Sequence, residues 1–107
     1  MTNLEILKAA RELLSDPKRW MQGRYAINSA GKSVGPDDPG AVCFCAEGAI
    51  RHIAPFAFET ALGALEKLVC GECSFWSLNS WNDSIYRTHA EVLSTFDLAI
   101  ALETADT

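Results

Sequence analysis

The sequence predicts a mainly helical α+β domain, with four helices around one core and a short β-hairpin between the first helix and the second. Apolar residues recur every three or four positions in four separate segments. Hydroxyl–carboxylate pairs mark two helix starts, and glycine, proline and asparagine cluster between the segments. Because 107 residues can bury one hydrophobic core, we expect residues 1–107 to form a single domain.

The first helix is expected over residues 3–15. Thr2 and Glu5 form a capping-box pattern, in which the hydroxyl and the carboxylate satisfy amide groups at a helix start. Pro17 cannot donate a backbone hydrogen bond and restricts Asp16, so the helix should end before them. The apolar residues with helical spacing are Ile6, Leu7, Ala10, Leu13 and Leu14.

A β-hairpin is expected between residues 24–27 and 32–35. Tyr25 and Ile27 lie at alternate positions, and residues 28–31 read Asn-Ser-Ala-Gly, which is a turn signal. A loop rich in proline and glycine follows. Since an isolated hairpin is only marginally stable in water, this one should pack against the helices.

Three further helices are predicted over residues 42–53, 58–69 and 89–103. Gly48 lies inside the second of these, and glycine disfavours a helix by about 1 kcal/mol relative to alanine. Its presence suggests that a neighbouring helix approaches closely at this point. The shared core is expected to contain Leu7, Leu14, Ala46, Ile50, Leu62, Leu65, Val92, Phe96 and Ile100.

The charge and hydropathy pattern excludes several classes of partner. The formal net charge is −5, so the chain lacks the basic face that usually binds nucleic acid or an anionic membrane. No apolar run reaches the roughly 18 residues of a membrane span, and no secretory signal pattern is present. Four cysteines in such a chain are expected to stay reduced, which favours the cytoplasm.

The four cysteines form a candidate zinc site as two close pairs, Cys43 with Cys45 and Cys70 with Cys73. A helix that begins at Val42 would, however, direct the first two thiols about 200° apart, where they could not hold one ion. The alternative is that the cysteines are small, partly buried apolar residues. We expect no metal and no cofactor.

Cys45 is also a candidate nucleophile. It lies near a predicted helix start, where aligned amide groups lower the pKa of a thiol. His89 could act as its base, with Asn82 or Asp83 orienting the imidazole, as in a cysteine-based hydrolase or transferase. The alternative is that His89 is a solvated residue in the first turn of the last helix.

Aromatic, arginine and amide side chains gather in the non-helical segments, where binding residues commonly lie. Because aromatic and arginine side chains supply most anchors of protein interfaces, we expect a binding surface where the hairpin meets the segment around Trp81. The alternative is structural: Trp81 fills one end of the core, Asn82 and Asp83 form a turn, and Arg87 pairs with Asp83. The candidate binding residues are Trp20, Arg24, Tyr25, Trp81, Asn82, Asp83 and Arg87.

Three separated stretches carry a further pattern. They read WMQGRYA over residues 20–26, CAEGAI over residues 45–50, and WND over residues 81–83 with RTHAEV over residues 87–92. Together they resemble a family of small domains of unknown function from bacteria and phages, over residues 4–102. The resemblance implies no reaction, and Cys70 and Cys73 fall outside its pattern. It suggests a phage or mobile-element origin.

These observations leave three hypotheses about function. The leading one is a cytosolic, non-enzymatic protein that binds another protein, with a host protein as the partner if the chain is phage-encoded. The first alternative is a cysteine-based enzyme built on Cys45 and His89. The second is a structural module stapled by zinc through the four cysteines.

Overall fold

The computed structural model describes residues 1–70 and 77–105. This described part is mainly helical α+β, with five α-helices, four of them at least seven residues long, and a two-stranded antiparallel sheet. The elements are α1 (Asn3–Leu13), a 3₁₀ turn η1 (Pro17–Arg19), β1 (Ala26–Asn28), β2 (Ala41–Phe44), α2 (Ala46–Ile53), α3 (Glu59–Cys70), α4 (Leu78–Asn82) and α5 (His89–Ala105).

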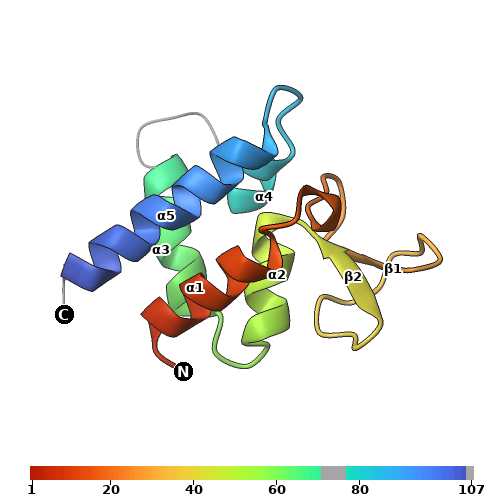
Figure 1. Cartoon of the computed structure of the whole chain (residues 1–107), viewed down its shortest axis with the longest axis horizontal. Coiled ribbons are helices and arrows are strands. Elements are labelled where there is room, and N and C mark those ends of the chain that lie inside the picture. Colours follow the sequence, from red (N-terminus) through yellow and green to blue (C-terminus); the bar gives the residue numbers. More distant parts are fainter. Residues whose placement is uncertain (71–76, 106–107) are drawn as a thin grey trace.

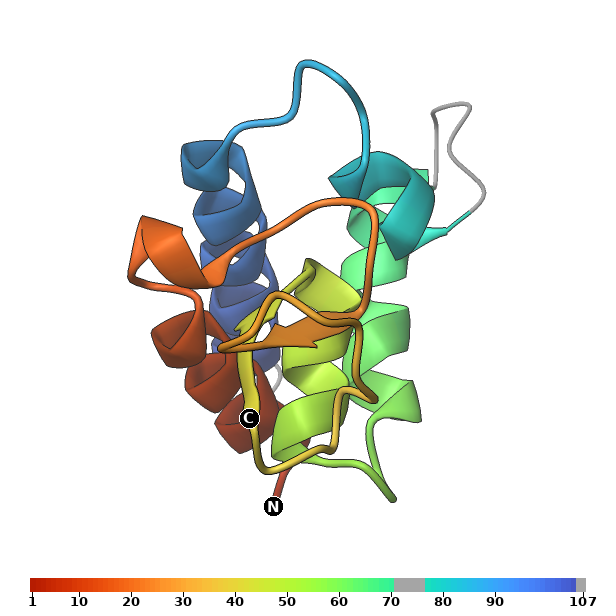
Figure 2. The ribbon, with the colours of Figure 1, turned by 90° about the vertical axis from the view of Figure 1, so that its right-hand side faces the viewer.

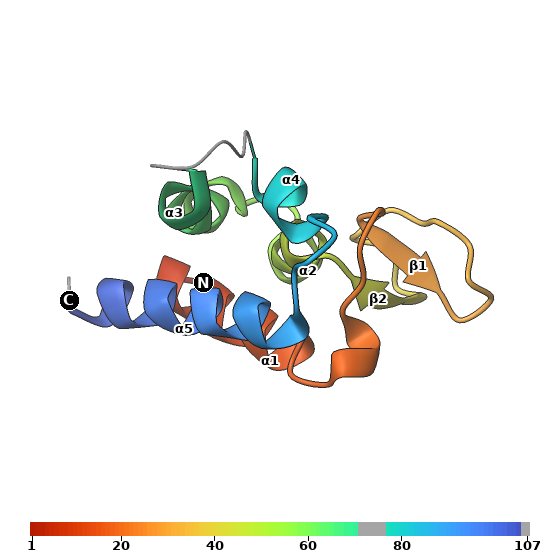
Figure 3. The same ribbon diagram turned by 90° about the horizontal axis from the view of Figure 1, so that it is seen from above.

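The helices are arranged in layers. Helices α1 and α5 pack side by side, α3 and α4 lie opposite them, and α2 lies between the two sets (Figure 2 and Figure 3). The sheet lies against α2 at one end of the helical body, on the right in Figure 1. The predicted fold class is therefore confirmed.

Helix α1 begins as the capping box predicts. The Glu5 amide donates to the Thr2 hydroxyl at 3.1 Å, and the Thr2 amide donates to the Glu5 carboxylate at 2.9 Å. The helix ends at Leu13, two residues before the predicted end. It ends there because the Ser15 hydroxyl donates to the Glu12 carbonyl and η1 starts at Pro17.

The predicted pairing of residues 24–27 with residues 32–35 is found only in part, because residues 32–35 form no strand. Strand β1 pairs instead with β2, in the register Ala26 with Phe44, Ile27 with Cys43 and Asn28 with Ala41. Residues 28–31 form the predicted turn, in which the Gly31 amide donates to the Asn28 carbonyl. Beyond the turn an isolated antiparallel bridge joins Ile27 to Ser33, with hydrogen bonds from the Asn28 amide to the Lys32 carbonyl and from the Val34 amide to the Ala26 carbonyl. Pairing with β2 is favoured because Ala26 and Phe44 are both buried in the core.

Helix α2 begins at Ala46 rather than at Val42. Residues 41–44 are the strand β2, and Cys45 is the N-cap residue, with an extended backbone and a thiol that accepts from the Gly48 amide at 3.2 Å. We expected the thiols of Cys43 and Cys45 to point in nearly opposite directions from one helix. This expectation is wrong, because Cys43 lies in β2 and Cys45 precedes α2. A short apolar run cannot be assigned to helix or strand from periodicity alone.

The remaining helices complete one core. Helices α3 and α5 agree with the prediction to within two residues, whereas α4 is a short helix in a stretch predicted to be irregular. Of the nine predicted core residues, seven are buried, and Leu62 and Ile100 are partly buried against the cluster. No helix of the described residues has both the length and the apolar character needed to span a bilayer.

Candidate binding surface around Asn82

Asn82, at the end of α4, is fully buried and joins three segments of the chain. Its side-chain oxygen accepts from the Trp20 indole at 2.8 Å and from the Ala46 amide at 3.1 Å. Its side-chain nitrogen donates to the Met21 carbonyl at 3.1 Å and to the Asp83 carboxylate at 2.9 Å. The amide group thus uses both its donors and both its acceptor positions, and it presents no surface to a ligand.

A second set of hydrogen bonds fastens the segment before β1 to the end of α4. The Gln22 side chain donates to the carbonyl groups of Asn82 and Ser84, both at 2.9 Å. The Gly23 amide donates to the Asp83 carboxylate at 2.9 Å. The two segments that sequence analysis expected to form a binding surface are therefore in direct contact, although Gln22 was not among the candidate residues.

The CAEGAI stretch supplies the third side of this junction, through the Ala46 amide and through Gly48. Glu47 is a buried carboxylate that binds Arg51 at 2.8 Å, and the Arg51 guanidinium lies 4.0 Å from the centre of the Phe58 ring. Gly48 lies so close to the Tyr25 carbonyl that a Cβ atom would collide with it. The expected close approach at Gly48 is confirmed, but the neighbour is the backbone before β1 and not a helix.

The loop between α4 and α5 is anchored at both ends and projects at the top of Figure 1. The Arg87 side chain donates to the Trp81 carbonyl at 2.9 Å, lies 4.0 Å from the centre of the Trp81 ring, and binds Glu91 at 3.2 Å. The Arg87 amide also donates to the Ser84 carbonyl at 2.9 Å. Trp81 itself is buried, so its indole packs in the core as the structural alternative expected.

Two large apolar side chains lie in this loop and are almost fully exposed. Ile85 is 83% exposed and Tyr86 is 85% exposed. Sequence analysis missed Ile85 because it belongs to no helical or alternating pattern. The available signal was an adjacent aliphatic and aromatic pair inside an otherwise polar stretch, residues 82–88.

A small pocket of about 110 Å³ lies where the two fastened segments meet, lined by Gly23, Arg24, Tyr25, Asn79 and Asp83. Arg24, Tyr25 and Asp83 are exposed at this pocket. Pockets for small metabolites usually enclose about 300–1,000 Å³. This pocket is therefore of a size to receive one projecting side chain rather than a complete metabolite.

The surroundings of Cys45 do not favour a nucleophilic role. Its thiol donates to the Asn79 side chain at 3.5 Å, and burial raises the pKa of the thiol to about 11 despite the bond from the Gly48 amide. His89 contacts other groups: its Nε2 lies 2.6 Å from the Leu14 carbonyl, and its ring lies 6.2 Å from that of Trp20. A buried thiol with a raised pKa is a poor nucleophile at neutral pH.

Cys43 and Cys70, the other two cysteines that the structure describes, lie on different elements. The Cys43 thiol in β2 donates to the Lys18 carbonyl at 3.2 Å, and Cys70 is the last residue of α3. Cys73 lies outside the described residues. Among residues 1–70 and 77–105, no three His, Cys, Asp or Glu side chains are grouped so that they could hold a metal ion.

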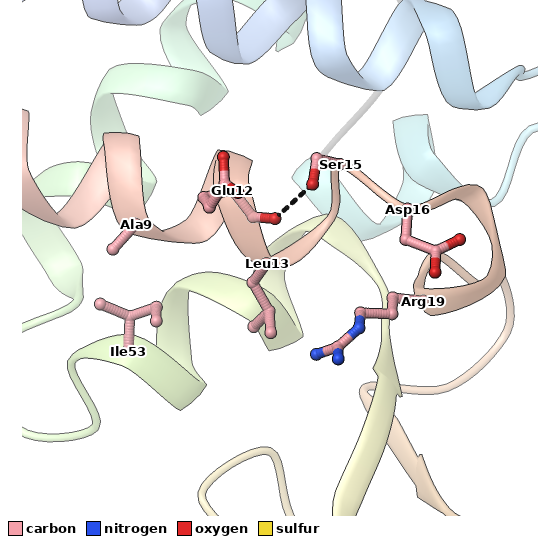
Figure 4. A pocket seen from close by; sticks show the side chains of 7 residues that line it. All are labelled: Ala9, Glu12, Leu13, Ser15, Asp16, Arg19 and Ile53. Atoms are coloured by element: carbon pink, nitrogen blue, oxygen red, sulfur yellow. Dashed lines mark hydrogen bonds between the residues drawn. The ribbon is translucent and has the colours of Figure 1, made fainter.

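A larger and more open concavity of about 500 Å³ lies between α1, η1 and the end of α2, and it contains none of the candidate site residues. Ala9 and Leu13 lie opposite Ile53 there, and the Arg19 side chain extends toward Leu13 (Figure 4). Its remaining lining residues are Glu12, Ser15 and Asp16. This mixture of exposed charges of both signs selects no particular class of ligand.

Comparison with known proteins gives one match. A family model described as a family of unknown function, DUF6197, matches residues 1–102. No curated protein and no solved structure matches the chain. The resemblance to a family of unknown function is thereby confirmed, and its three sequence stretches meet in space around Asn82. The chain belongs to the DUF6197 family of unknown function.

Proposed function

We propose that this protein is a non-enzymatic binding protein that contacts another protein through one surface, here named the Tyr86 surface. This surface consists of Arg24, Tyr25, Asp83, Ile85 and Tyr86. The observation that carries the proposal is the exposure of Ile85 and Tyr86, at 83% and 85%, on an anchored loop. Exposed apolar side chains that are held in place are typical of protein interaction sites.

The anchoring of the loop supports a preformed surface. The Ser84 carbonyl, directly before Ile85, accepts hydrogen bonds from the Gln22 side chain and the Arg87 amide. Little conformational entropy is then lost when a partner binds, because the loop is already held in one conformation. Such preorganisation favours an interface in which two side chains act as the main anchors.

The polar residues of the Tyr86 surface add specificity. Arg24 and Asp83 have opposite charges and line the pocket of about 110 Å³ together with Tyr25. A partner side chain that enters this pocket would meet a guanidinium, a carboxylate and a phenol. We extend the proposal to a host protein as the partner, because the sequence stretches resemble domains of bacteria and phages.

Capture from a bacterial lysate tests the proposal when wild type is compared with a double variant of the surface and with a control variant. Wild-type protein, an Ile85→Ala/Tyr86→Ala variant and a Phe56→Ala control are immobilised, and bound proteins are quantified by mass spectrometry. Phe56 is a matched control because it is 98% exposed and lies at the opposite end of the molecule, in the loop between α2 and α3.

A partner is accepted only if the purified protein then binds in calorimetry. We expect the double variant to weaken that binding by at least about tenfold, as for central interface anchors, while Phe56→Ala leaves it unchanged. If the double variant and wild type capture the same proteins equally well, the Tyr86 surface is not the binding site and the proposal fails.

A further inference from the structure

Helix α5 is apolar on its outer face as well as on the face that enters the core. Val92, Phe96 and Ala99 are buried, yet Leu98 is 52% exposed and Leu102 is 50% exposed. The exposed alanines 101 and 105 continue the outer face at helical spacing. A helix with apolar residues on its outer face as well as its inner face is normally covered on both. The described fold covers only one side of α5.

A groove between α3 and α5 continues this outer face. It encloses about 180 Å³ and is lined by Ala64, Lys67 and Leu68 from α3 and by Ala99, Leu102 and Glu103 from α5. The last turns of α5 extend beyond α1 and α3 (Figure 1 and Figure 3). The groove and the outer face of α5 therefore form one accessible apolar surface.

The groove has one charge of each sign. Lys67 is on the α3 side and Glu103 is on the α5 side. Within the described residues, neither makes an ion pair. A surface with this arrangement is complementary to itself, because a two-fold axis brings Lys67 of each copy toward Glu103 of the other.

We propose that this surface binds a second copy of the chain, to form a two-fold dimer through α3 and α5. Leu98 and Leu102 would pack at the centre, and two symmetric Lys67–Glu103 pairs would lie at the rim. The pairs matter because two copies with a net charge of −5 repel each other. A local attraction between opposite charges then fixes where the copies meet. This proposal is independent of the Tyr86 surface.

Sedimentation velocity over a range of protein concentrations tests the proposal. We expect a reversible equilibrium between monomer and dimer, and Leu102→Asp should raise the dissociation constant by at least about tenfold. Lys67→Glu and Glu103→Lys should each raise it roughly threefold to thirtyfold, since each disrupts two exposed pairs at low ionic strength. The double exchange Lys67→Glu/Glu103→Lys should restore the wild-type value.

Ile85→Asp is the matched control, since it places a charge on the Tyr86 surface and should leave the dissociation constant unchanged. Circular dichroism establishes that each variant is folded, and if Leu102→Asp unfolds, the charge exchange decides the outcome. A wild-type protein that stays monomeric at every concentration overturns the proposal. So does a double exchange that fails to restore association, or a dimer that Ile85→Asp disrupts and Leu102→Asp does not.

Discussion

The indole nitrogen of Trp20 donates a hydrogen bond of 2.8 Å to the side-chain oxygen of Asn82, which lies 62 positions later in the chain. The same oxygen accepts from the Ala46 amide at the start of α2. One buried oxygen atom thus joins the segment before β1, the start of α2 and the end of α4. The three sequence stretches that carry the resemblance meet at this junction, which adjoins the Tyr86 surface.

Replacing Asn82 by alanine should destabilise the protein strongly. The change leaves the Trp20 indole, the Ala46 amide and the Met21 carbonyl without their buried partner, and each unsatisfied group costs about 1–3 kcal/mol. We expect a total loss of about 3–5 kcal/mol in the free energy of unfolding, measured with urea. Asn79→Ala, on the same helix, is the control and should cost clearly less, because within residues 1–70 and 77–105 its side chain bonds only to the Cys45 thiol, at 3.5 Å.

Replacing Gly48 by alanine should destabilise the protein even though alanine favours helices. The new Cβ atom would meet the Tyr25 carbonyl, which is backbone and cannot turn aside, so we expect a loss of about 1–3 kcal/mol. Gly63 in α3 is the matched control, since a Cβ atom there has no neighbour within 4 Å. Gly63→Ala should stabilise by about 0.5–1 kcal/mol. Thermal and urea unfolding of the two variants should therefore shift in opposite directions; a stabilised Gly48→Ala would contradict the contact.

Local sequence signals were sufficient to predict α1 and α5. They failed at residues 42–44, because strand pairing between distant segments decides the structure there. The capping residues Thr2 and Glu5 depend only on neighbours within one turn, so the start of α1 could be predicted. Residues 42–53 have apolar spacing that fits a helix throughout, but their first three residues lie in β2, which pairs with β1. Whether these residues form a strand or a helix depends on the burial of Phe44 against residues that are distant in the sequence. A local sequence pattern carries no information about such contacts.

For the candidate site, too, part could be predicted from the sequence and part depended on tertiary structure. Sequence analysis expected the segments around Tyr25 and Trp81 to meet, and their hydrogen bonds confirm the contact. It could not tell that Asn82 is completely buried, because asparagine is usually exposed. Nor could sequence analysis identify Ile85 as a candidate binding residue, because only its exposure in the folded protein points to that role.

Cys43 should react with thiol reagents faster than Cys45 in the folded protein. Cys43 lies half-exposed in β2, whereas the Cys45 thiol is buried with its pKa raised to about 11. Labelling with iodoacetamide near neutral pH, followed by peptide mass spectrometry, gives the two rates. We expect labelling at Cys45 to be slower by at least about tenfold and to become equal to Cys43 in urea. Equal rates in the folded protein would show that Cys45 is accessible.

The raised pKa of Cys45 also predicts how stability changes at alkaline pH. Since burial raises the pKa from 9.0 to about 11, folding favours the protonated thiol, and its contribution is complete below pH 9. The contribution should then be lost as the pH rises from 9 toward 11. Cys45→Ser keeps a side chain that can cap the helix, and its hydroxyl does not titrate in this range. Urea unfolding at several pH values should show a loss in wild type that exceeds the loss in Cys45→Ser by about 1–3 kcal/mol; parallel curves would contradict the burial of the thiol.

Arg24 and Asp83 both line the small pocket, but their replacements should behave differently. Arg24 donates one exposed hydrogen bond to the Gly31 carbonyl, so Arg24→Ala should change the free energy of unfolding by less than about 0.5 kcal/mol. Asp83 accepts bonds from the Gly23 amide and the Asn82 side chain, so Asp83→Ala should destabilise the fold by about 1–2 kcal/mol.

Arg24→Ala is therefore the better probe of binding at this pocket, because a loss of affinity cannot be attributed to unfolding. Calorimetry with the partner captured by the Tyr86 surface should show affinity reduced by at least about fivefold, through the lost guanidinium at the pocket edge. Arg19→Ala is the control, since Arg19 is also exposed but lies in the concavity beside α1. If Arg19→Ala reduces affinity and Arg24→Ala does not, the partner binds at that concavity, and the pocket lined by Arg24 and Asp83 has no part in binding.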